Sequence, residues 1–174
     1  MTIQITKPAP EFSAKAYHNG TFVNIKLTDY RGKWVVLVFY PRDFTFICPT
    51  ELAEFGRRKA DFEKLNAVIL GASTDSEHSH KAWISRDLPD VTFPILADTA
   101  HSISRDYGVL ADDGAAERGT FIIDPQGILK YMVISASSVG RSINETLRVL
   151  KALQTGDLCP VEWAPGQKTL GKAG

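Results

Sequence analysis

An uninterrupted apolar run at residues 34–40 (Trp-Val-Val-Leu-Val-Phe-Tyr) constrains the fold of this chain more than any other segment. Its β-branched and aromatic residues favour an extended strand, and the lack of alternation with polar residues predicts a strand that is buried on both faces. The run is far too short to cross a bilayer. Because both faces need cover, it predicts a strand at the centre of a layered domain.

Short strand patterns and helical patterns alternate along the rest of the chain. Turn signals stand at residues 18–20 (His-Asn-Gly) and 125–127 (Pro-Gln-Gly). We expect further strands at 21–27, 67–72, 93–96, 120–124 and 128–134, and helices at about 49–65, 74–85, 101–107 and 142–153. This order predicts a three-layer α/β fold with a mixed central sheet.

Two capping boxes predict helix starts, one at Thr74 with Glu77 and one at Ser142 with Glu145. The inward stripe of the last helix is expected to consist of Ile143, Leu147, Leu150 and Leu153. After this helix the chain is rich in Gly and Pro and follows no regular pattern. We therefore expect one domain over residues 1–154 and an exposed C-terminal arm over residues 155–174.

The charge balance excludes one class of partner. Twenty lysine and arginine residues match twenty aspartate and glutamate residues, whereas broad binding to nucleic acid or anionic membrane needs a basic surplus. The first residues hold no apolar signal segment, so we expect a cytoplasmic protein. No Gly-rich phosphate loop follows a predicted strand, so we expect no nucleotide or flavin cofactor.

Cysteine and histidine are scarce in this chain, with two cysteines (Cys48 and Cys159) and four histidines. Two cysteines make no disulfide framework, and the scattered histidines make no zinc pattern. Because His78 and His80 point to different faces of the predicted helix, we interpret them as solvated surface residues and expect no metal site. In a reducing compartment, two cysteines serve either packing or chemistry.

Cys48 follows the first buried strand and stands at the predicted start of a helix. The partial positive charge and free backbone N–H groups at such a helix end favour a thiolate over a thiol. Thr45 can offer a hydroxyl to the same pocket, and Pro41 can shield it from water. Taken alone, however, a cysteine in this place is more often a small apolar residue packed under the helix.

The pattern Pro41-x-x-x-Thr45-x-x-Cys48 resembles, residue for residue, the active-site signature of the peroxiredoxins. Similar segments recur at residues 39–40, 49–51, 83, 93–98, 107–109, 118–125, 139–142 and 158–166. The resemblance covers nearly the full length and is to the typical 2-Cys type, in particular the bacterial alkyl hydroperoxide reductase C subunit. It implies a thioredoxin-like fold and an antioxidant thiol-dependent peroxidase.

By this resemblance Cys48 is the peroxidatic cysteine, whose thiolate attacks a hydroperoxide and becomes a sulfenic acid. Arg118 matches the family's active-site arginine, and a guanidinium there can stabilise the thiolate and hold peroxide oxygens. Without the resemblance, Arg118 would be read as a surface residue before a strand. Thr45, Arg118 and a backbone N–H near Cys48 are expected to donate hydrogen bonds to the leaving oxygen in the transition state. Glu51 is expected to orient an arginine, or is simply an acid favoured by the helix dipole.

The segment that begins at Cys159 (Cys-Pro-x-x-Trp-x-Pro-Gly) resembles the resolving-cysteine segment of the typical 2-Cys type. That role implies attack on the Cys48 sulfenic acid of a partner subunit and an intersubunit disulfide. It implies a homodimer that can join a decameric ring. The plainer alternative is an incidental exposed thiol. Electrons must then come from a disulfide-reducing protein, which could be a flavin-dependent alkyl hydroperoxide reductase F subunit, thioredoxin or an AhpD-type reductase.

Two rival functions share this fold. A thioredoxin-like disulfide reductase needs Cys-x-x-Cys at the turn from strand to helix, but here Thr45 takes the place of the first cysteine, so no local dithiol exists. The alternative of a different class is a non-catalytic holdase chaperone or a redox-signalling module. Retained anti-aggregation activity in a Cys48→Ser variant would support it.

Overall fold

The computed structural model describes residues 3–172. The described chain divides after Arg141 into two compact units. The predicted boundary between a domain at 1–154 and an arm at 155–174 stays a prediction.

A mixed sheet forms the centre of the first unit. In the part of the chain that the structure describes, seven strands pair in the order β2-β1-β5-β4-β3-β6-β7. Their bounds are β1 Ser13–His18, β2 Thr21–Lys26, β3 Trp34–Phe39, β4 Ala67–Ser73, β5 Ile95–Ala97, β6 Arg118–Ile123 and β7 Leu129–Ser135. β3 runs parallel to β4 and antiparallel to β6, with Leu37 opposite both Leu70 and Phe121. The predicted α/β class with a mixed sheet is confirmed.

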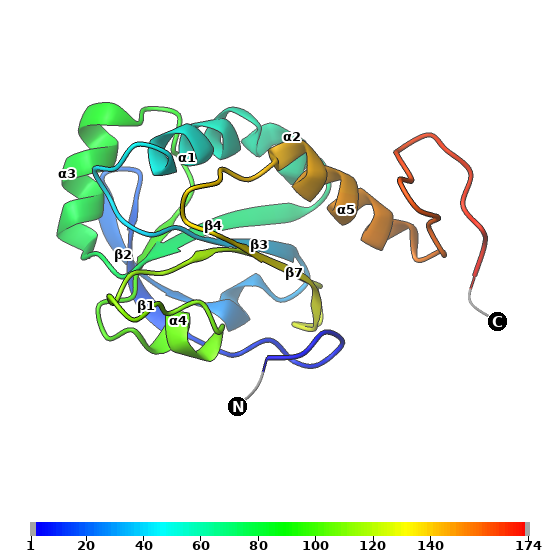
Figure 1. The fold of residues 1–174 in the computed structure, drawn as a ribbon, viewed down its shortest axis with the longest axis horizontal. Coiled ribbons are helices and arrows are strands. Elements are labelled where there is room, and N and C mark those ends of the chain that lie inside the picture. Colours follow the sequence, from blue (N-terminus) through cyan, green and yellow to red (C-terminus); the bar gives the residue numbers. More distant parts are fainter. Residues whose placement is uncertain (1–2, 173–174) are drawn as a thin grey trace. The chain divides into compact units, whose positions relative to one another are not determined.

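Helices cover both faces of this sheet, as Figure 1 shows, with α1 and α2 over one face and α4 over the other. The helical elements of the first unit are η1 Leu27–Tyr30, α1 Cys48–Arg57, α2 Lys59–Glu63, α3 Glu77–Asp87 and α4 Ser102–Asp106. Val35, Leu37 and Phe39 of β3 share one core cluster with Ile103 of α4. Val36 and Val38, which point to the opposite face, are also fully buried. The prediction that this run is covered on both sides is therefore confirmed for residues 35–40, whereas Trp34 is only half-buried.

Two predicted helix boundaries were wrong. The helix expected at 49–65 is interrupted at Arg58, whose backbone (φ −95°, ψ 5°) leaves the helical region, so α1 and α2 are separate. α3 is capped by Ser76, whose side chain accepts a hydrogen bond from Ser79 N, and not by a box that starts at Thr74. Both candidates are good N-cap residues, and sequence pattern alone could not choose between hydroxyls two positions apart.

The second unit holds α5 (Ile143–Thr155) and a segment without helix or strand. Ser142 caps α5 by accepting from Glu145 N, and Gly156 ends it in the left-handed conformation (φ 65°) that glycine tolerates. Ile143, Leu147 and Leu150 are buried as expected, but Leu153 is only half-buried.

The segment after α5 folds back on itself. Leu158 N donates to Gly171 O and Leu170 N donates to Leu158 O, each at 2.8 Å. Trp163 is almost fully buried, and its carbonyl oxygen accepts from Arg148. The segment is therefore held by its own hydrogen bonds although it forms no regular element.

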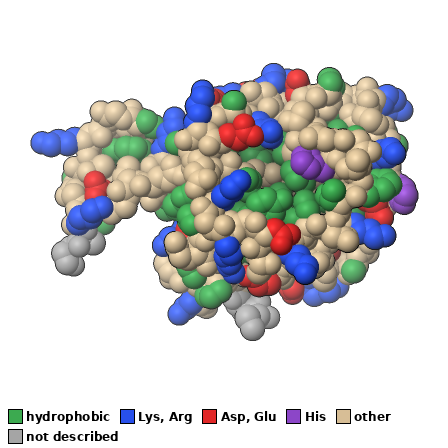
Figure 2. All heavy atoms as spheres, turned by 180° about the vertical axis from the view of Figure 1, so that it is seen from behind, with side chains coloured by type: hydrophobic (Ala, Val, Ile, Leu, Met, Phe, Trp, Pro, Cys, Tyr) green, Lys and Arg blue, Asp and Glu red, His purple; other side chains and the backbone are tan. Residues whose placement is uncertain are grey.

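Acidic and basic side chains are interspersed around an apolar area on the face that Figure 2 shows. Over residues 3–172, no helix has the length and apolar content needed to cross a membrane. Across the same residues, no group of three or more His, Cys, Asp or Glu side chains could hold a metal ion.

Candidate active site

Cys48 is the first residue of α1 and is fully buried. The chain leaves β3 at Phe39, passes through the loop 40–47 and enters the helix, where Pro49 suits the first turn because its missing N–H would have no partner there. Both cysteines of the chain are free thiols. Cys48 therefore lies at the positive end of a helix in a site closed to bulk water, where an anion is stabilised.

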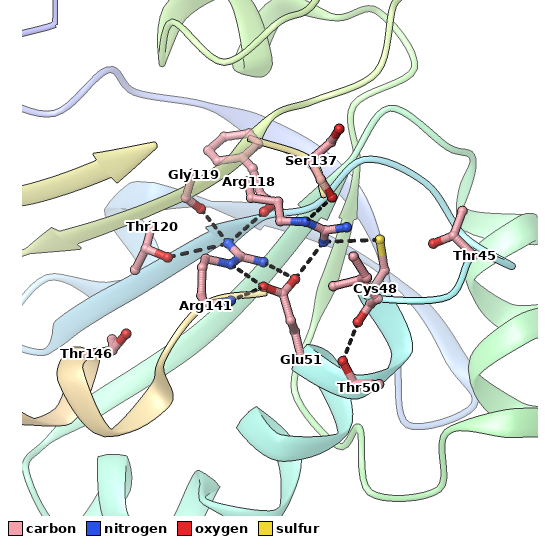
Figure 3. Close-up of polar contacts among 12 residues, drawn as sticks. Thr45, Cys48, Thr50, Glu51, Arg118, Gly119, Thr120, Ser137, Arg141 and Thr146 are labelled. Carbon is pink, nitrogen blue, oxygen red and sulfur yellow. Dashed lines mark hydrogen bonds and ion pairs between the residues drawn. The ribbon is translucent and has the colours of Figure 1, made fainter. Parts of the chain in front are cut away.

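Arg118 is the first residue of β6 and points its guanidinium at the sulfur. Because β6 runs antiparallel to β3 with Thr120 opposite Val38, Arg118 lies beyond the end of β3, where the chain turns into α1. Its Nη1 lies 3.4 Å from Cys48 Sγ, as Figure 3 shows. Arg118 is 3% exposed, so the contact is made out of water. The pairing of β6 with β3 thus explains an encounter between residues seventy positions apart.

Glu51, one turn after Cys48 on α1, holds Arg118 in place. Its Oε2 lies 2.7 Å from Arg118 Nη1 and 2.8 Å from Arg141 Nη2. Its Oε1 accepts from the backbone N–H and the Nε of Arg141, at 2.7 and 2.9 Å. Burial alone would raise the pKa of Glu51, but the hydrogen bonds and charge of Arg141 and the charge of Arg118 outweigh it and lower the pKa. Glu51 is therefore a carboxylate.

Arg141 and Ser137 complete the frame around these groups. Arg141 Nη1 donates to Phe39 O at 2.8 Å and to Gly119 O at 2.9 Å, which ties it to the ends of two strands. Arg118 Nε donates to Ser137 O at 2.8 Å. Each guanidinium is thus held by several acceptors with fixed directions, which limits its rotation.

The charged side chains of this site carry one more positive than negative charge. Arg118 and Arg141 bring two permanent positive charges, and Glu51 brings one negative charge. The remainder is one buried positive charge next to Cys48 Sγ. Because an unpaired buried charge is costly, the arrangement favours an anion at the sulfur.

In the part of the chain that the structure describes, neither Thr45 nor Pro41 makes a hydrogen bond with Cys48. The Thr45 hydroxyl donates to Arg42 O at 3.0 Å, and no dashed line joins Thr45 to Cys48 in Figure 3. Thr45 and Pro41 both line a pocket of about 270 Å³, and Ser137 lines it too. A small molecule in this pocket would therefore be next to the residue that accepts from Arg118.

Cys159 lies in the second unit, just after the C-terminal end of α5, and is half-buried. Its Sγ is 3.8 Å from Ala152 O and 3.5 Å from Thr155 Oγ1. A thiol can donate weakly to such a carbonyl oxygen. Cys159 thus follows the C-terminal end of a helix, whereas Cys48 stands at the N-terminal end of one.

The interpretation of His80 as a solvated residue was wrong. Its side chain is completely buried, with Nδ1 2.8 Å from Asp43 Oδ2 and Nε2 3.1 Å from Leu96 O. His78 is 76% exposed at its side chain, as expected. Helical spacing placed the two histidines on different faces but could not say which face packs on the sheet.

Sequence reasoning assigned no role to Arg141 or Asp43. Arg141 stands in the segment 139–142, which resembles the corresponding segment of the peroxiredoxins. That resemblance was the signal that could have identified Arg141 as a functional residue. Asp43 lies inside the signature loop at a position that the pattern leaves open. Both are defined by contacts with residues far away in the sequence, which no local pattern reveals.

Comparison with known proteins identifies the family. The model of the AhpC/TSA family matches residues 5–132. The chain belongs to the AhpC/TSA family. It is 51% identical over 176 residues to peroxiredoxin prdx-2 of Caenorhabditis elegans, an alignment that covers 95% of this chain and 88% of that protein. Curated relatives of this similarity are peroxiredoxins, so this AhpC/TSA chain is an enzyme of the thiol peroxidase class.

Solved structures show the same fold. The reduced 2-Cys peroxiredoxin of Plasmodium vivax superposes with a TM-score of 0.92 at 36% identity, over 97% of this chain and 93% of that one. AhpC of Enterococcus faecalis superposes with a TM-score of 0.86 at 35% identity, over 90% of this chain and 98% of that one. The expected thioredoxin-like fold of the AhpC/TSA family is confirmed.

Proposed function

We propose that Cys48 is the peroxidatic cysteine of a hydroperoxide reductase. Its thiolate attacks one oxygen of the hydroperoxide, the O–O bond breaks and an S–O bond forms. The leaving oxygen takes a proton and departs as water or an alcohol, and the sulfur is left as a sulfenic acid. The observation that carries this proposal is the buried contact of 3.4 Å between Arg118 Nη1 and Cys48 Sγ.

Arg118 also stabilises the transition state of this step. Negative charge builds on the leaving oxygen in the transition state, and a fixed cation in a dry site stabilises it more strongly than water does. Glu51 and Arg141 hold the guanidinium in position, so no reorganisation is needed during the reaction. The charge count supports this assignment, since the buried positive charge matches first the thiolate and then the leaving oxygen.

Thr45 and Pro41 form the substrate pocket in this proposal. With its proton donated to Arg42 O, the Thr45 oxygen keeps lone pairs that can accept from the O–H of a hydroperoxide. Donation to the leaving oxygen would require the hydroxyl to rotate. Pro41 has no N–H and limits water in the pocket. A pocket of this modest size suits hydrogen peroxide and small organic hydroperoxides.

We assign Cys159 as the resolving cysteine. Its thiol attacks the Cys48 sulfenic acid of a partner subunit, water leaves and an intersubunit disulfide forms. Support comes from its half-exposed place among few hydrogen bonds, because a mobile thiol must bring its sulfur within bonding distance of the other. The disulfide is then reduced by a protein partner, for which thioredoxin, a flavin-dependent reductase F subunit and an AhpD-type reductase are the candidates, in the reducing cytoplasm.

The proposed homodimer has a surface that fits it. β7 is an edge strand of the sheet, and three consecutive apolar residues on it, Met132, Val133 and Ile134, are 37–45% exposed. Such an edge is a template for pairing with a second copy. Phe44 and Phe46 in the loop before α1 are a second exposed apolar area, at 51% and 95%, which supports further association of dimers into a ring.

One experiment tests the cysteine cycle. Fully reduced protein receives one equivalent of hydrogen peroxide, and the products are read by non-reducing gel and intact mass. We expect a covalent dimer in the wild type and none in Cys48→Ser or Cys159→Ser, with sulfenic acid trapped on Cys48 in the latter. If Cys48 stays reduced while peroxide persists for minutes, the proposal fails.

A further inference from the structure

A second buried polar cluster lies under the loop that leads to Cys48. We call it the Asp43 cluster, and it consists of Tyr40, Asp43, Ser79 and His80. Tyr40, Asp43 and His80 are at most 6% exposed. Asp43 Oδ1 accepts from Tyr40 Oη at 2.7 Å, and Asp43 Oδ2 accepts from Ser79 Oγ at 2.7 Å. The proposed reaction uses none of these side chains, and their hydrogen bonds to one another offset the cost of burying them.

The hydrogen-bond partners decide the charge of this cluster. Leu96 O is a backbone carbonyl and can only accept, so His80 Nε2 carries a hydrogen. Asp43 already accepts from two hydroxyls, which indicates a carboxylate, so the hydrogen between Asp43 Oδ2 and His80 Nδ1 belongs to the ring. Burial and the charge of Asp43 raise the pKa of Tyr40 well above its usual 10, so its hydroxyl stays a donor. These donors and acceptors fit an ion pair between His80 and the Asp43 carboxylate, which is the arrangement that our proposal uses.

Asp43 anchors the loop 41–47 to neighbouring elements. Besides its side-chain contacts, its backbone N–H donates to Asp75 Oδ2 at 2.8 Å. The next residue, Phe44, has a φ of 56°, a conformation that a non-glycine residue keeps only when its surroundings impose it. Thr45 follows directly, and its hydroxyl bonds within the same loop to Arg42 O. The place of Asp43 therefore sets the place of Thr45.

We propose that His80 is a positioning residue for the peroxide reaction, which acts through Asp43 to hold the loop that carries Pro41 and Thr45. This inference rests on the proposed function of Cys48. His80 lies on α3, and its ring is held by the carbonyl oxygen of Leu96 on β5. Its partner, the Asp43 carboxylate, belongs to the loop. The ion pair therefore links the loop to the sheet without touching the reacting atoms.

The first test measures the wild-type protein and needs no activity. In a ¹⁵N NMR spectrum with histidine ring labels, we expect both nitrogens of His80 to be protonated at neutral pH and to resonate close together. A neutral ring would give one protonated and one bare nitrogen, with widely separated resonances. That result would overturn the ion pair on which the proposal depends.

The second test separates positioning from general reactivity of the thiol. Reduced His80→Gln is mixed rapidly with hydrogen peroxide and, separately, with iodoacetamide, which needs no peroxide pocket. We expect the rate constant for peroxide to fall between about tenfold and a hundredfold, because small misplacement of contacting groups costs that much. The rate with iodoacetamide is expected not to fall. His78→Gln, two residues away on the exposed face of α3, is the matched control and should keep both rates.

The outcomes distinguish the two proposals. A wild-type protein that reacts with iodoacetamide but not with peroxide contradicts the proposed function itself. A wild type that reduces peroxide, together with a His80→Gln variant of equal peroxide rate, overturns the positioning role alone. So does a variant in which both rates fall by the same factor, since His80 would then act on the thiol and not on the peroxide pocket.

Discussion

Two buried charged clusters flank the chain between β3 and α1, and they differ in the kind of base that they contain. The cluster of Glu51, Arg118 and Arg141 joins one carboxylate to two guanidinium groups that stay charged at every accessible pH. The Asp43 cluster joins one carboxylate to a histidine. The first has a surplus positive charge and the second has none. The first therefore fits an anion at the sulfur, and the second fits a structural anchor.

The difference also appears in what each cluster connects. Glu51 and the two arginines join the first turn of α1, which begins with Cys48, to the ends of β3 and β6. Asp43 and His80 join the preceding loop, which carries Pro41 and Thr45, to α3 and β5. The two clusters are similarly buried, but they differ in net charge and in the elements that they connect.

The largest expected effect comes from Glu51→Gln, which removes the only negative charge of the first cluster. Two arginines would then face each other without a carboxylate, and we expect a loss of about 3–5 kcal/mol in the free energy of unfolding. Urea denaturation measures it. Glu54→Gln, which breaks the exposed pair with Arg57, is the matched control. A loss as small as that of the control would contradict the importance of the buried network.

Arg118→Met should leave the fold intact but remove the cation beside Cys48 Sγ. We expect the rate constant for peroxide to fall by about 10²- to 10³-fold, the usual cost of one lost transition-state contact of this kind. Rapid mixing of reduced enzyme with peroxide measures it, and Arg57→Met on the exposed side of α1 serves as control. An unchanged rate would place the catalytic cation elsewhere.

Tyr40→Phe tests the Asp43 cluster by removing the hydroxyl that donates to Asp43 Oδ1. The change leaves Asp43 Oδ1 without its hydroxyl donor in a buried site, and we expect a loss of about 1–3 kcal/mol in unfolding free energy. Thermal and urea unfolding measure it, beside Tyr30→Phe at a half-buried tyrosine outside the cluster. If both variants lose the same amount, the hydroxyl of Tyr40 contributes little.

The smallest expected effect is a decrease, at acidic pH, in the contribution of Glu51 to the free energy of unfolding. Because the folded structure lowers the pKa of Glu51 from its ordinary 4.5, the stabilisation that it brings is complete above that ordinary value. It is lost as pH falls through the lower pKa of the folded state. The difference in unfolding free energy between the wild type and Glu51→Gln should therefore shrink in acid. A difference that stays constant from neutral pH to below pH 4.5 would contradict the lowered pKa.

The sequence by itself determined the sheet-and-helix order, the burial of residues 35–40 and the place of Cys48 at a helix start, because these depend on periodicity, turn residues and chain direction. The signature spacing also singled out Thr45, Pro41 and Cys48, which lie within eight residues of one another. Such features are local, and local patterns encode them well.

Only the tertiary structure decided which distant charges meet. Arg118 reaches Cys48 because β6 pairs with β3 in a particular register, and Arg141 reaches Glu51 across ninety positions. His80 is buried because that side of α3 packs toward β5, where Leu96 O accepts from the ring. A helical pattern shows which residues share a face but not what the face contacts, so burial and pairing of polar side chains had to come from the fold.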